Sequence, residues 1–241
     1  MRIAILSDVH ANALALEAVY ADIRSQRIDE VVFLGDLVMT GPRPREAYSL
    51  MKEINPVVWL QGNTDNWVEA INGDFVPSTS KEEFIKSLND FACARLGEAE
   101  RHDLAGRHIM QTLKLGGLDI AFCHGSPTSF SQGILPDTPQ DELEVIASSL
   151  GGSMLCCGHT HTRFFMEYKG TRICNFGAVS MPGTDRCKSA RYGILDIRNS
   201  DTVAWECRDV LFDIDAFFLD MKQLKYPGLE MVRNKYGYYL V

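Results

Sequence analysis

Histidine, aspartate and asparagine residues follow five separate apolar runs in this 241-residue chain. Residues 3–7 lead into Asp8 and His10, residues 31–35 into Asp36, residues 57–61 into Gly62 and Asn63, residues 118–123 into His124, and residues 154–157 into Gly158, His159 and His161. Each run is typical of a β-strand. Since loops at the carboxyl ends of strands converge at one edge of an α/β sheet, we expect these seven metal-type side chains to meet there.

The donor atoms in this set favour a transition metal. Imidazole nitrogens combined with carboxylate and amide oxygens suit manganese, iron, zinc or nickel better than calcium. Seven donors are too many for one ion, but they suit two ions about 3.5–4 Å apart that share a carboxylate and a bridging hydroxide. Asp36 is the sole ligand after its strand and is the expected bridge. The sequence therefore predicts two divalent transition-metal ions.

Each motif has a simpler interpretation when it is taken alone. Gly-Asp and Gly-Asn after a strand are common turn signals, and a histidine near an aspartate is often a structural pair. A structural zinc site built from Cys156, Cys157, His159 and His161 is a further alternative. Adjacent cysteines lack the C-x₂-C spacing that suits one tetrahedral ion. The repeated strand–loop order of all five motifs favours the two-metal interpretation.

The elements around these motifs alternate between strand and helix. A helix is expected after residue 12, with Asn12 as its cap, and further helices are expected over 44–54, 80–104, 139–150 and 213–224. Gly116-Gly117 and Lys169-Gly170 predict hairpin turns in the second half. We expect an α/β fold in one domain over 1–241, with a helical insert at about 66–106 and a carboxyl-terminal helix and tail at about 209–241.

The overall composition limits the classes of partner. The chain has 24 basic and 32 acidic residues, a formal charge of −8, which gives no basis for non-specific binding to nucleic acid or to an anionic membrane. No apolar run reaches the roughly 20 residues of a membrane span. Seven cysteines in mostly apolar surroundings suggest reduced thiols and a cytoplasmic protein. The aromatic residues near the carboxyl terminus are expected either to pack back on the sheet or to form a homo-oligomer contact.

Together the motifs resemble the calcineurin-like metallophosphoesterase superfamily. The matching segments are Asp8-Val9-His10, Gly35-Asp36, Gly62-Asn63, His124 and Gly158-His159-Thr160-His161. The stretches SDVHAN and NFGAVSMPGTDR resemble the small bacterial and archaeal YfcE-like phosphodiesterases. This resemblance implies an αββα sandwich of two mixed β-sheets flanked by helices. It also implies that one metal is held by Asp8, His10, Asp36 and His161, and the other by Asp36, Asn63, His124 and His159.

The function implied by the resemblance is that of a metal-dependent phosphoesterase. We expect a phosphodiesterase or phosphoanhydride hydrolase that uses a bridging hydroxide on a small nucleotide-like phosphoester substrate. Asp36, Asn63, Thr64 and Asp65 are the expected catalytic residues. Thr64 stands where the family commonly has a histidine, and a threonine hydroxyl is a negligible acid near neutral pH. The alternative is therefore a catalytically weakened metal-binding scaffold for protein interaction.

Four further polar residues are candidate substrate contacts. Asn12, Arg43, Arg163 and Arg186 lie close in sequence to the motifs, and a guanidinium group suits a phosphate. The simpler alternatives are that Asn12 only caps a helix and that the three arginines are solvated surface residues.

Overall fold

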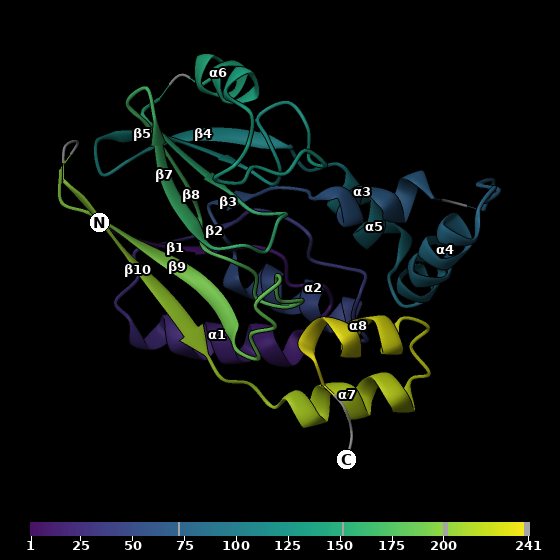
Figure 1. The fold of residues 1–241 in the computed structure, drawn as a ribbon. Helices are drawn as coiled ribbons and strands as arrows, with labels where there is room; N and C mark the ends of the chain where they lie inside the picture. Colours follow the sequence, from purple (N-terminus) through teal and green to yellow (C-terminus); the bar gives the residue numbers. More distant parts are fainter. Residues whose placement is uncertain (72, 151, 200–201, 239–241) are drawn as a thin grey trace.

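The computed structural model describes residues 1–71, 73–150, 152–199 and 202–238, and it contains two five-stranded sheets (Figure 1). The first sheet has the order β10-β9-β1-β2-β3, and the second has the order β4-β5-β6-β8-β7. The strands of the first are β1 (Arg2–Leu6), β2 (Glu30–Phe33), β3 (Val58–Trp59), β9 (Ala190–Ile197) and β10 (Val203–Val210). Those of the second are β4 (Met110–Leu115), β5 (Leu118–Cys123), β6 (Met154–Cys157), β7 (Phe164–Tyr168) and β8 (Thr171–Asn175).

Each sheet contains three neighbouring parallel strands, joined to antiparallel partners. In the first sheet β1, β2 and β3 are parallel, and β9 pairs antiparallel with β1 and with β10. In the second sheet β5, β6 and β8 are parallel, while β4 and β7 form the antiparallel edges. Parallel strands place their carboxyl ends at the same edge, so each sheet presents three strand ends side by side.

The two sheets pack face to face around a shared apolar core. Ile3, Ile5 and Val32 of the first sheet and Ile120 and Phe122 of the second belong to one buried cluster. The intervening residues of β1 face the other way, into a second cluster formed with the helices. Both faces of β1 are therefore buried, which explains why its sequence is continuously apolar rather than alternating.

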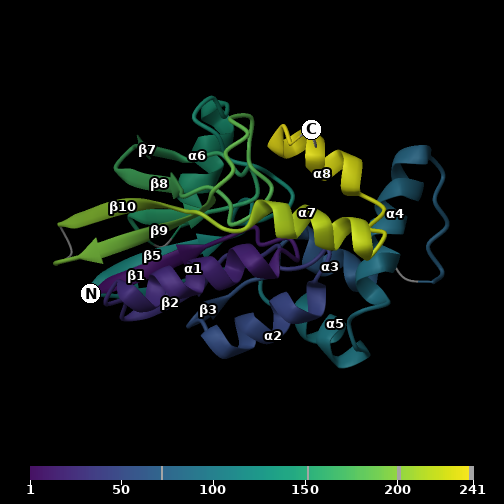
Figure 2. The same cartoon turned by 90° about the horizontal axis from the view of Figure 1, so that it is seen from below.

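Helices cover the outer faces of both sheets. The helices are α1 (Ala13–Ser25), α2 (Pro44–Ile54), α3 (Asn63–Ala70), α4 (Ser80–Cys93), α5 (Glu98–Ala105), α6 (Gln140–Ser148), α7 (Ile214–Gln223) and α8 (Leu229–Tyr236). α1 and α2 lie on the first sheet with α7 and α8 beside them (Figure 2), and α6 packs on the second sheet. Asn12 accepts a hydrogen bond from the Ala15 amide at 3.0 Å, which confirms its predicted role as the cap of α1.

The predicted α/β class and the αββα sandwich are confirmed. The hairpins at Gly116-Gly117 and Lys169-Gly170 also form as expected. Four details differ. β3 has only two residues, and the helical segment begins at Asn63 rather than near residue 66. The helix expected over 80–104 is two helices, α4 and α5, and the expected tail forms an additional helix, α8. Residues 239–241 of the expected tail lie outside the described residues.

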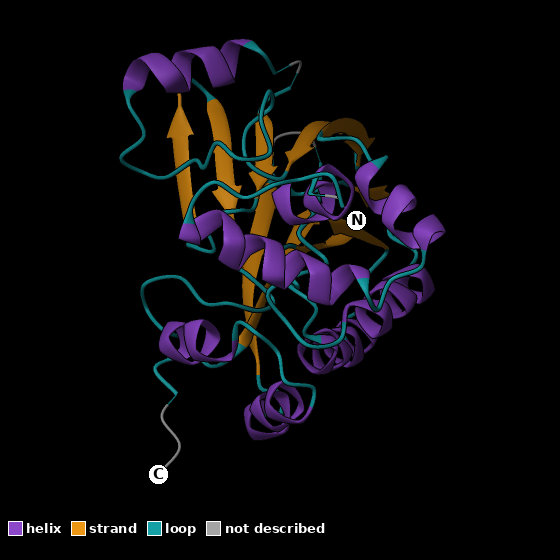
Figure 3. Cartoon of the chain, turned by 90° about the vertical axis from the view of Figure 1, so that its right-hand side faces the viewer, coloured by secondary structure: helices purple, strands orange, loops and turns teal. Residues whose placement is uncertain are grey.

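The helical insert and the carboxyl-terminal helices lie next to each other on one side of the molecule (Figure 3). Leu88 of α4, Tyr226 and Val232 share the core cluster with the outer face of the first sheet. The rings of Phe91 and Tyr226 meet edge to face with centroids 4.9 Å apart. Among the described residues, no helix combines the length and the apolarity that a membrane span requires.

Candidate metal centre

The structure gathers six of the seven predicted ligands into two adjacent groups of three. Asp8, His10 and His161 form one group, and Asp36, His124 and His159 form the other. Within each group the potential ligand atoms all lie within 4.8 Å of one another. The two groups come from the ends of β1, β2, β5 and β6, which is the convergence that the strand–loop pattern predicted.

The carboxylates of Asp8 and Asp36 lie between these histidines. Asp8 Oδ1 is 3.1 Å from His161 Nε2 and 3.8 Å from both His10 Nε2 and His124 Nε2. Asp36 Oδ2 is 3.4 Å from His124 Nε2 and 3.7 Å from His10 Nε2, which belong to different groups. Asp36 is therefore placed to contact both groups, as a bridging ligand would be.

Hydrogen bonds to the backbone fix the orientation of two of the histidines. His124 Nδ1 lies 3.1 Å from the Leu34 carbonyl oxygen, and His161 Nδ1 contacts the Met181 carbonyl oxygen. Because a carbonyl oxygen only accepts, each Nδ1 must carry the donated proton. The lone pair of the neutral ring is then on Nε2, the atom that faces the carboxylates, which is the arrangement expected of a metal-binding histidine.

Several ligand atoms are buried without a hydrogen-bond partner among the described residues, and the nearest groups to two of them are other ligands. These atoms are Asp8 Oδ1, His124 Nε2 and Asn63 Oδ1. Buried polar atoms are nearly always satisfied, and each unsatisfied one costs about 1–3 kcal/mol. An anionic oxygen and an amide oxygen have lone pairs that a cation can use, and the imidazole nitrogen gains one when it releases its proton to the incoming metal. The donor set therefore fits divalent transition metals.

Backbone strain is concentrated at the same residues. Asp8, His10, Asp36, His159 and His161 all adopt left-handed conformations, with φ between 51° and 65°. This region is uncommon for residues other than glycine, and it persists where surrounding contacts impose it. The sharp turns it produces direct the side chains back over the ends of the strands.

Asp65 supplies one of the contacts that impose these turns. Its carboxylate accepts backbone hydrogen bonds from Asp36 (2.7 Å), Leu37 (2.9 Å), Val38 (3.2 Å) and Gly62 (3.0 Å). It therefore ties the loop after β2 to the loop after β3. Since these amides use both carboxylate oxygens, the contacts point to a positioning role rather than the catalytic role expected from the sequence. Burial, together with the nearby Asp36, raises the pKa of Asp65 to about 7.

Two glycines allow the loops to approach this closely. A Cβ on Gly62 would lie 2.1 Å from Asp36 Oδ1 and 2.6 Å from the Asp36 amide nitrogen. A Cβ on Gly158 would lie 2.0 Å from Ser7 Oγ and 3.0 Å from Asp8 Oδ2. Any other residue at these positions would push against a ligand or its neighbour, so the glycines in the Gly-Asn and Gly-His motifs have a steric purpose.

At most of the ionisable ligands, neighbouring opposite charges shift the pKa more than burial does. Burial by itself would raise the pKa of Asp36, but His124 and His10 hold it at about 2. Burial opposes charge on His124 as well, yet Asp36 and Asp8 raise the pKa of its ring to about 9. Burial lowers the pKa of His10 to about 4. Without metal, a proton on His124 thus offsets part of the carboxylate charge, and a divalent cation would displace it on binding.

The Thr64 hydroxyl is bound to the backbone and does not face the metal ligands. Its Oγ1 donates to the Val38 carbonyl at 2.9 Å, and its amide donates to Asp36 Oδ1 at 2.8 Å. The side chain is buried in the first turn of α3. Its contacts orient the Asp36 carboxylate and hold the loop after β2, and they do not supply an acid for a leaving group.

The four candidate substrate contacts have different surroundings. Asn12 is buried, caps α1 and donates to Ser180 Oγ at 3.1 Å. Arg43 binds both carboxylate oxygens of Asp220, and Arg163 binds Asp209 and two backbone carbonyls. Arg186 is exposed and borders a cavity next to the histidine loop. The polar groups of Asn12, Arg43 and Arg163 are thus bound within the protein. Of the four candidates, Arg186 alone has a guanidinium group that remains accessible to a substrate.

The structural zinc alternative does not fit the geometry. Cys156 belongs to the core between the sheets, whereas Cys157 belongs to the cluster beneath α6. Their side chains leave opposite faces of β6, as expected of consecutive strand residues. The two thiols therefore cannot reach one ion together with His159 and His161, and they act as buried apolar groups.

One part of the site was not predicted from the sequence: the support that the carboxyl-terminal helix α8 gives to it. The Tyr236 hydroxyl accepts a hydrogen bond from the Met181 amide at 2.9 Å and lies 3.0 Å from Ser180 Oγ. The Met181 carbonyl is the partner of His161 Nδ1. Tyr236 thus supports a ligand histidine through Met181, whose amide contacts Tyr236 and whose carbonyl contacts His161. Its sequence context is simply aromatic-rich, which gives no signal of such a role.

The chain belongs to the calcineurin-like phosphoesterase superfamily. Residues 1–200 match the domain that defines this superfamily, which confirms the family predicted from the motifs. A curated relative is uncharacterized protein MJ0912 of Methanocaldococcus jannaschii, 26% identical over 179 residues that cover 73% of this chain and 69% of that protein.

Two solved structures share the fold over almost the whole chain. The hypothetical protein PH1004 from Pyrococcus horikoshii OT3 superposes with a TM-score of 0.83 at 22% identity and covers 100% of this chain and 99% of its own. A metallophosphoesterase from Sphaerobacter thermophilus gives a TM-score of 0.76 at 24% identity, with 98% of both chains covered. The shared fold therefore includes α7 and α8, which follow the family match.

Proposed function

We propose that this protein is a metal-dependent phosphoesterase that hydrolyses a phosphodiester or phosphoanhydride bond in a small nucleotide-like substrate. The observation that carries the proposal is the set of buried donor atoms without a hydrogen-bond partner: one on Asp8 and one on His124, each in a different group of ligands, and a third on Asn63. Membership of the phosphoesterase superfamily supports the same reaction class.

The proposed ligand sets are the two groups in the structure with Asn63 added to the second. Asp8, His10 and His161 would hold one ion, while Asn63, His124 and His159 would hold the other, with Asp36 shared between them. Manganese, iron, zinc and nickel all suit these donors. When bound, such a pair of ions lowers the pKa of water and polarises phosphoryl oxygens.

The contribution of the chain itself is to hold these donors in place. Asp65 joins two ligand loops, and backbone carbonyls orient His124 and His161. The Thr64 amide holds one oxygen of Asp36, which leaves the other free to face the histidines. Donors fixed in advance need no reorganisation when charge develops in the transition state, which is how such a site accelerates a reaction.

The contacts of Thr64 also favour substrates whose leaving group departs without being protonated. Its hydroxyl is bound to a backbone carbonyl, so it provides no proton to a departing oxygen. General-acid catalysis typically contributes about 10²–10⁴-fold, so substrates that need it would react slowly. We therefore expect phosphoanhydrides and activated aryl esters to be better substrates than alkyl esters.

The test is hydrolysis of bis-p-nitrophenyl phosphate in the presence of manganese. We expect the wild type to release p-nitrophenol, and we expect Asn63→Ala to lose activity by roughly 10²-fold, as when one stabilising group is removed from an active site. Asn66→Ala is the matched control, because Asn66 lies in the same helix. Among the described residues, its side chain hydrogen-bonds only to the Gln61 side chain, at 3.3 Å. A wild type no faster than Asn63→Ala would reject the enzyme and favour the metal-binding scaffold.

A further inference from the structure

A cavity of about 440 Å³ opens beside the loop that carries His159 and His161, and it is lined by the neighbours of His161 rather than by the ligands themselves. Thr160 and Thr162, on either side of His161, form one wall, and Arg186 and Lys235 form part of the other. Gly183, which also lines the cavity, packs against the backbone of His161, because a Cβ on Gly183 would lie 3.1 Å from the His161 carbonyl oxygen. A volume of this size is ordinary for a small-molecule site.

The cations of this cavity lack the partners that arginines elsewhere have. Arg186 and Lys235 are exposed, and neither forms an ion pair with any residue in the described part of the chain. Asp185, the acidic neighbour of Arg186, is bound by Arg191 instead. In a chain with a net charge of −8, two uncompensated cations at one cavity create a local site for an anion.

The rest of the lining is suited to oxyanions. The hydroxyls of Thr160 and Thr184 and the side-chain amide of Asn234 can donate hydrogen bonds, whereas Thr162 Oγ1 already donates to the Thr160 carbonyl at 3.2 Å. The residues that border the cavity include no carboxylate and no aromatic ring. Hydrogen bonds from cations to phosphate are among the strongest in proteins. A nucleobase would find no surface for stacking here, so the lining favours phosphate groups over a base.

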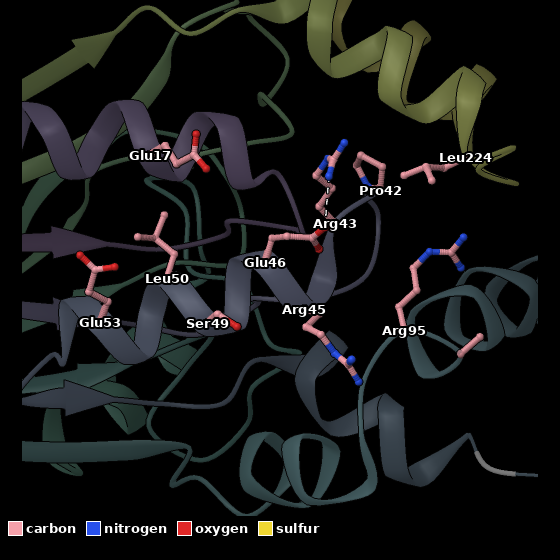
Figure 4. A pocket seen from close by; sticks show the side chains of 11 residues that line it. Glu17, Pro42, Arg43, Arg45, Glu46, Ser49, Leu50, Glu53, Arg95 and Leu224 are labelled. Carbon is pink, nitrogen blue, oxygen red and sulfur yellow. Dashed lines mark hydrogen bonds and ion pairs between the residues drawn. The ribbon is translucent and has the colours of Figure 1, made fainter.

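A larger cavity of about 760 Å³ provides a contrast (Figure 4). It also contains arginines, but Glu17, Glu46 and Glu53 line it together with them. Arg43 there is bound by Asp220 and Glu46. Its charges compensate one another within the protein, so its greater size gives no reason to expect an anion.

We propose that the cavity between the histidine loop and α8 binds a second phosphate group of the substrate, next to the phosphate that reacts. This inference rests on the proposed function and narrows its substrate class to compounds with a phosphoanhydride chain. Hydrolysis then breaks one P–O–P bond: a water molecule gives its hydroxyl group to one phosphoryl group and its remaining proton to solvent, and the other phosphate leaves as its oxyanion. Arg186 lies within the family match, whereas Lys235 belongs to α8, beyond residue 200 where that match ends, so the carboxyl-terminal helix would supply one of the two cations.

The test compares inorganic tripolyphosphate, which has a second phosphate, with bis-p-nitrophenyl phosphate, which does not. We measure kcat/KM for both with manganese in the wild type and in the double variant Arg186→Gln/Lys235→Gln. We expect the ratio of the two kcat/KM values, tripolyphosphate over aryl diester, to fall by about tenfold or more in the double variant, because two charge-assisted contacts are lost. The variant Arg45→Gln/Lys52→Gln removes the same charge elsewhere and is expected to keep the wild-type ratio.

Binding of imidodiphosphate, measured by calorimetry, separates this inference from the proposed function. We expect the double variant to bind this non-hydrolysable probe about tenfold more weakly than the wild type or the Arg45→Gln/Lys52→Gln control. Equal binding, or an unchanged ratio of kcat/KM values, would overturn the second phosphate site. A wild type that hydrolyses neither compound but binds the probe through Arg186 and Lys235 would overturn the proposed reaction and leave the site in place.

Discussion

Replacing Tyr236 with phenylalanine tests the support that α8 gives to the metal centre. The change removes the hydroxyl that accepts from the Met181 amide at 2.9 Å and lies 3.0 Å from Ser180 Oγ. Ser180 Oγ still receives a hydrogen bond from Asn12, but the Met181 amide loses its acceptor in a buried place. An unsatisfied buried amide costs about 1–3 kcal/mol, so we expect a loss of about 2 kcal/mol in the free energy of unfolding.

The assay is urea unfolding of metal-free protein, followed by manganese binding at equilibrium. With an m-value of about 2–3 kcal/mol/M, the loss corresponds to a midpoint lower by about 0.7–1 M urea. Because Met181 also holds His161 Nδ1, we expect weaker manganese binding, by about 10- to 100-fold as for other residues that orient a metal ligand.

Tyr226→Phe is the matched control for this prediction. Tyr226 is as deeply buried as Tyr236, at 3% and 2% exposure, but its hydroxyl has no hydrogen-bond partner among the described residues. Removal of an unsatisfied buried hydroxyl is expected to leave stability unchanged or to increase it. If both variants change the midpoint and the manganese affinity equally, the reasoning about Tyr236 is wrong.

Two further substitutions test the steric and hydrogen-bonding roles assigned near Asp36. Gly62→Ala places a methyl group only 2.1 Å from Asp36 Oδ1, so we expect loss of bound manganese and a destabilisation of about 1–3 kcal/mol. Gly73→Ala is the control, because nothing lies within 4 Å of the Cβ it adds. Normal manganese content in Gly62→Ala would refute the steric argument. Thr64→Val removes the hydrogen bond to the Val38 carbonyl, so we expect the free energy of unfolding to fall by about 1–2 kcal/mol with nearly normal turnover. A collapse of turnover at unchanged stability would show that the hydroxyl takes part in catalysis.

The parts of the fold that the sequence predicts well are those whose signals are local. The β1-α1-β2 alternation follows from a short apolar run, the Asn12 cap and helical spacing of apolar residues, all within about 30 positions. Gly116-Gly117 and Lys169-Gly170 mark hairpins because positive φ is required at those turns, and Gly116, Gly117, Lys169 and Gly170 do adopt it. The ligand loops were predictable for the same reason, since each motif directly follows a strand.

The parts that the sequence does not reveal depend on contacts between distant segments. Asp65 stands beside Asn63 in a loop that suggests catalysis, and only the fold shows that four backbone amides surround its carboxylate. Tyr236 reaches Met181 across 55 positions. Arg43 and Arg163 are indistinguishable from Arg186 in sequence, yet the first two are paired with Asp220 and Asp209. Such pairings are decided by tertiary packing, which periodicity and turn signals do not encode.

The measurement that tests the central claim most directly is the number of manganese ions bound per chain at equilibrium, determined by elemental analysis after dialysis. The two groups of ligands predict two ions per chain in the wild type and in the double variant Cys156→Ser/Cys157→Ser, because both thiols lie away from the site. One ion per chain, none, or a loss of metal on replacing the cysteines would contradict the two-metal centre.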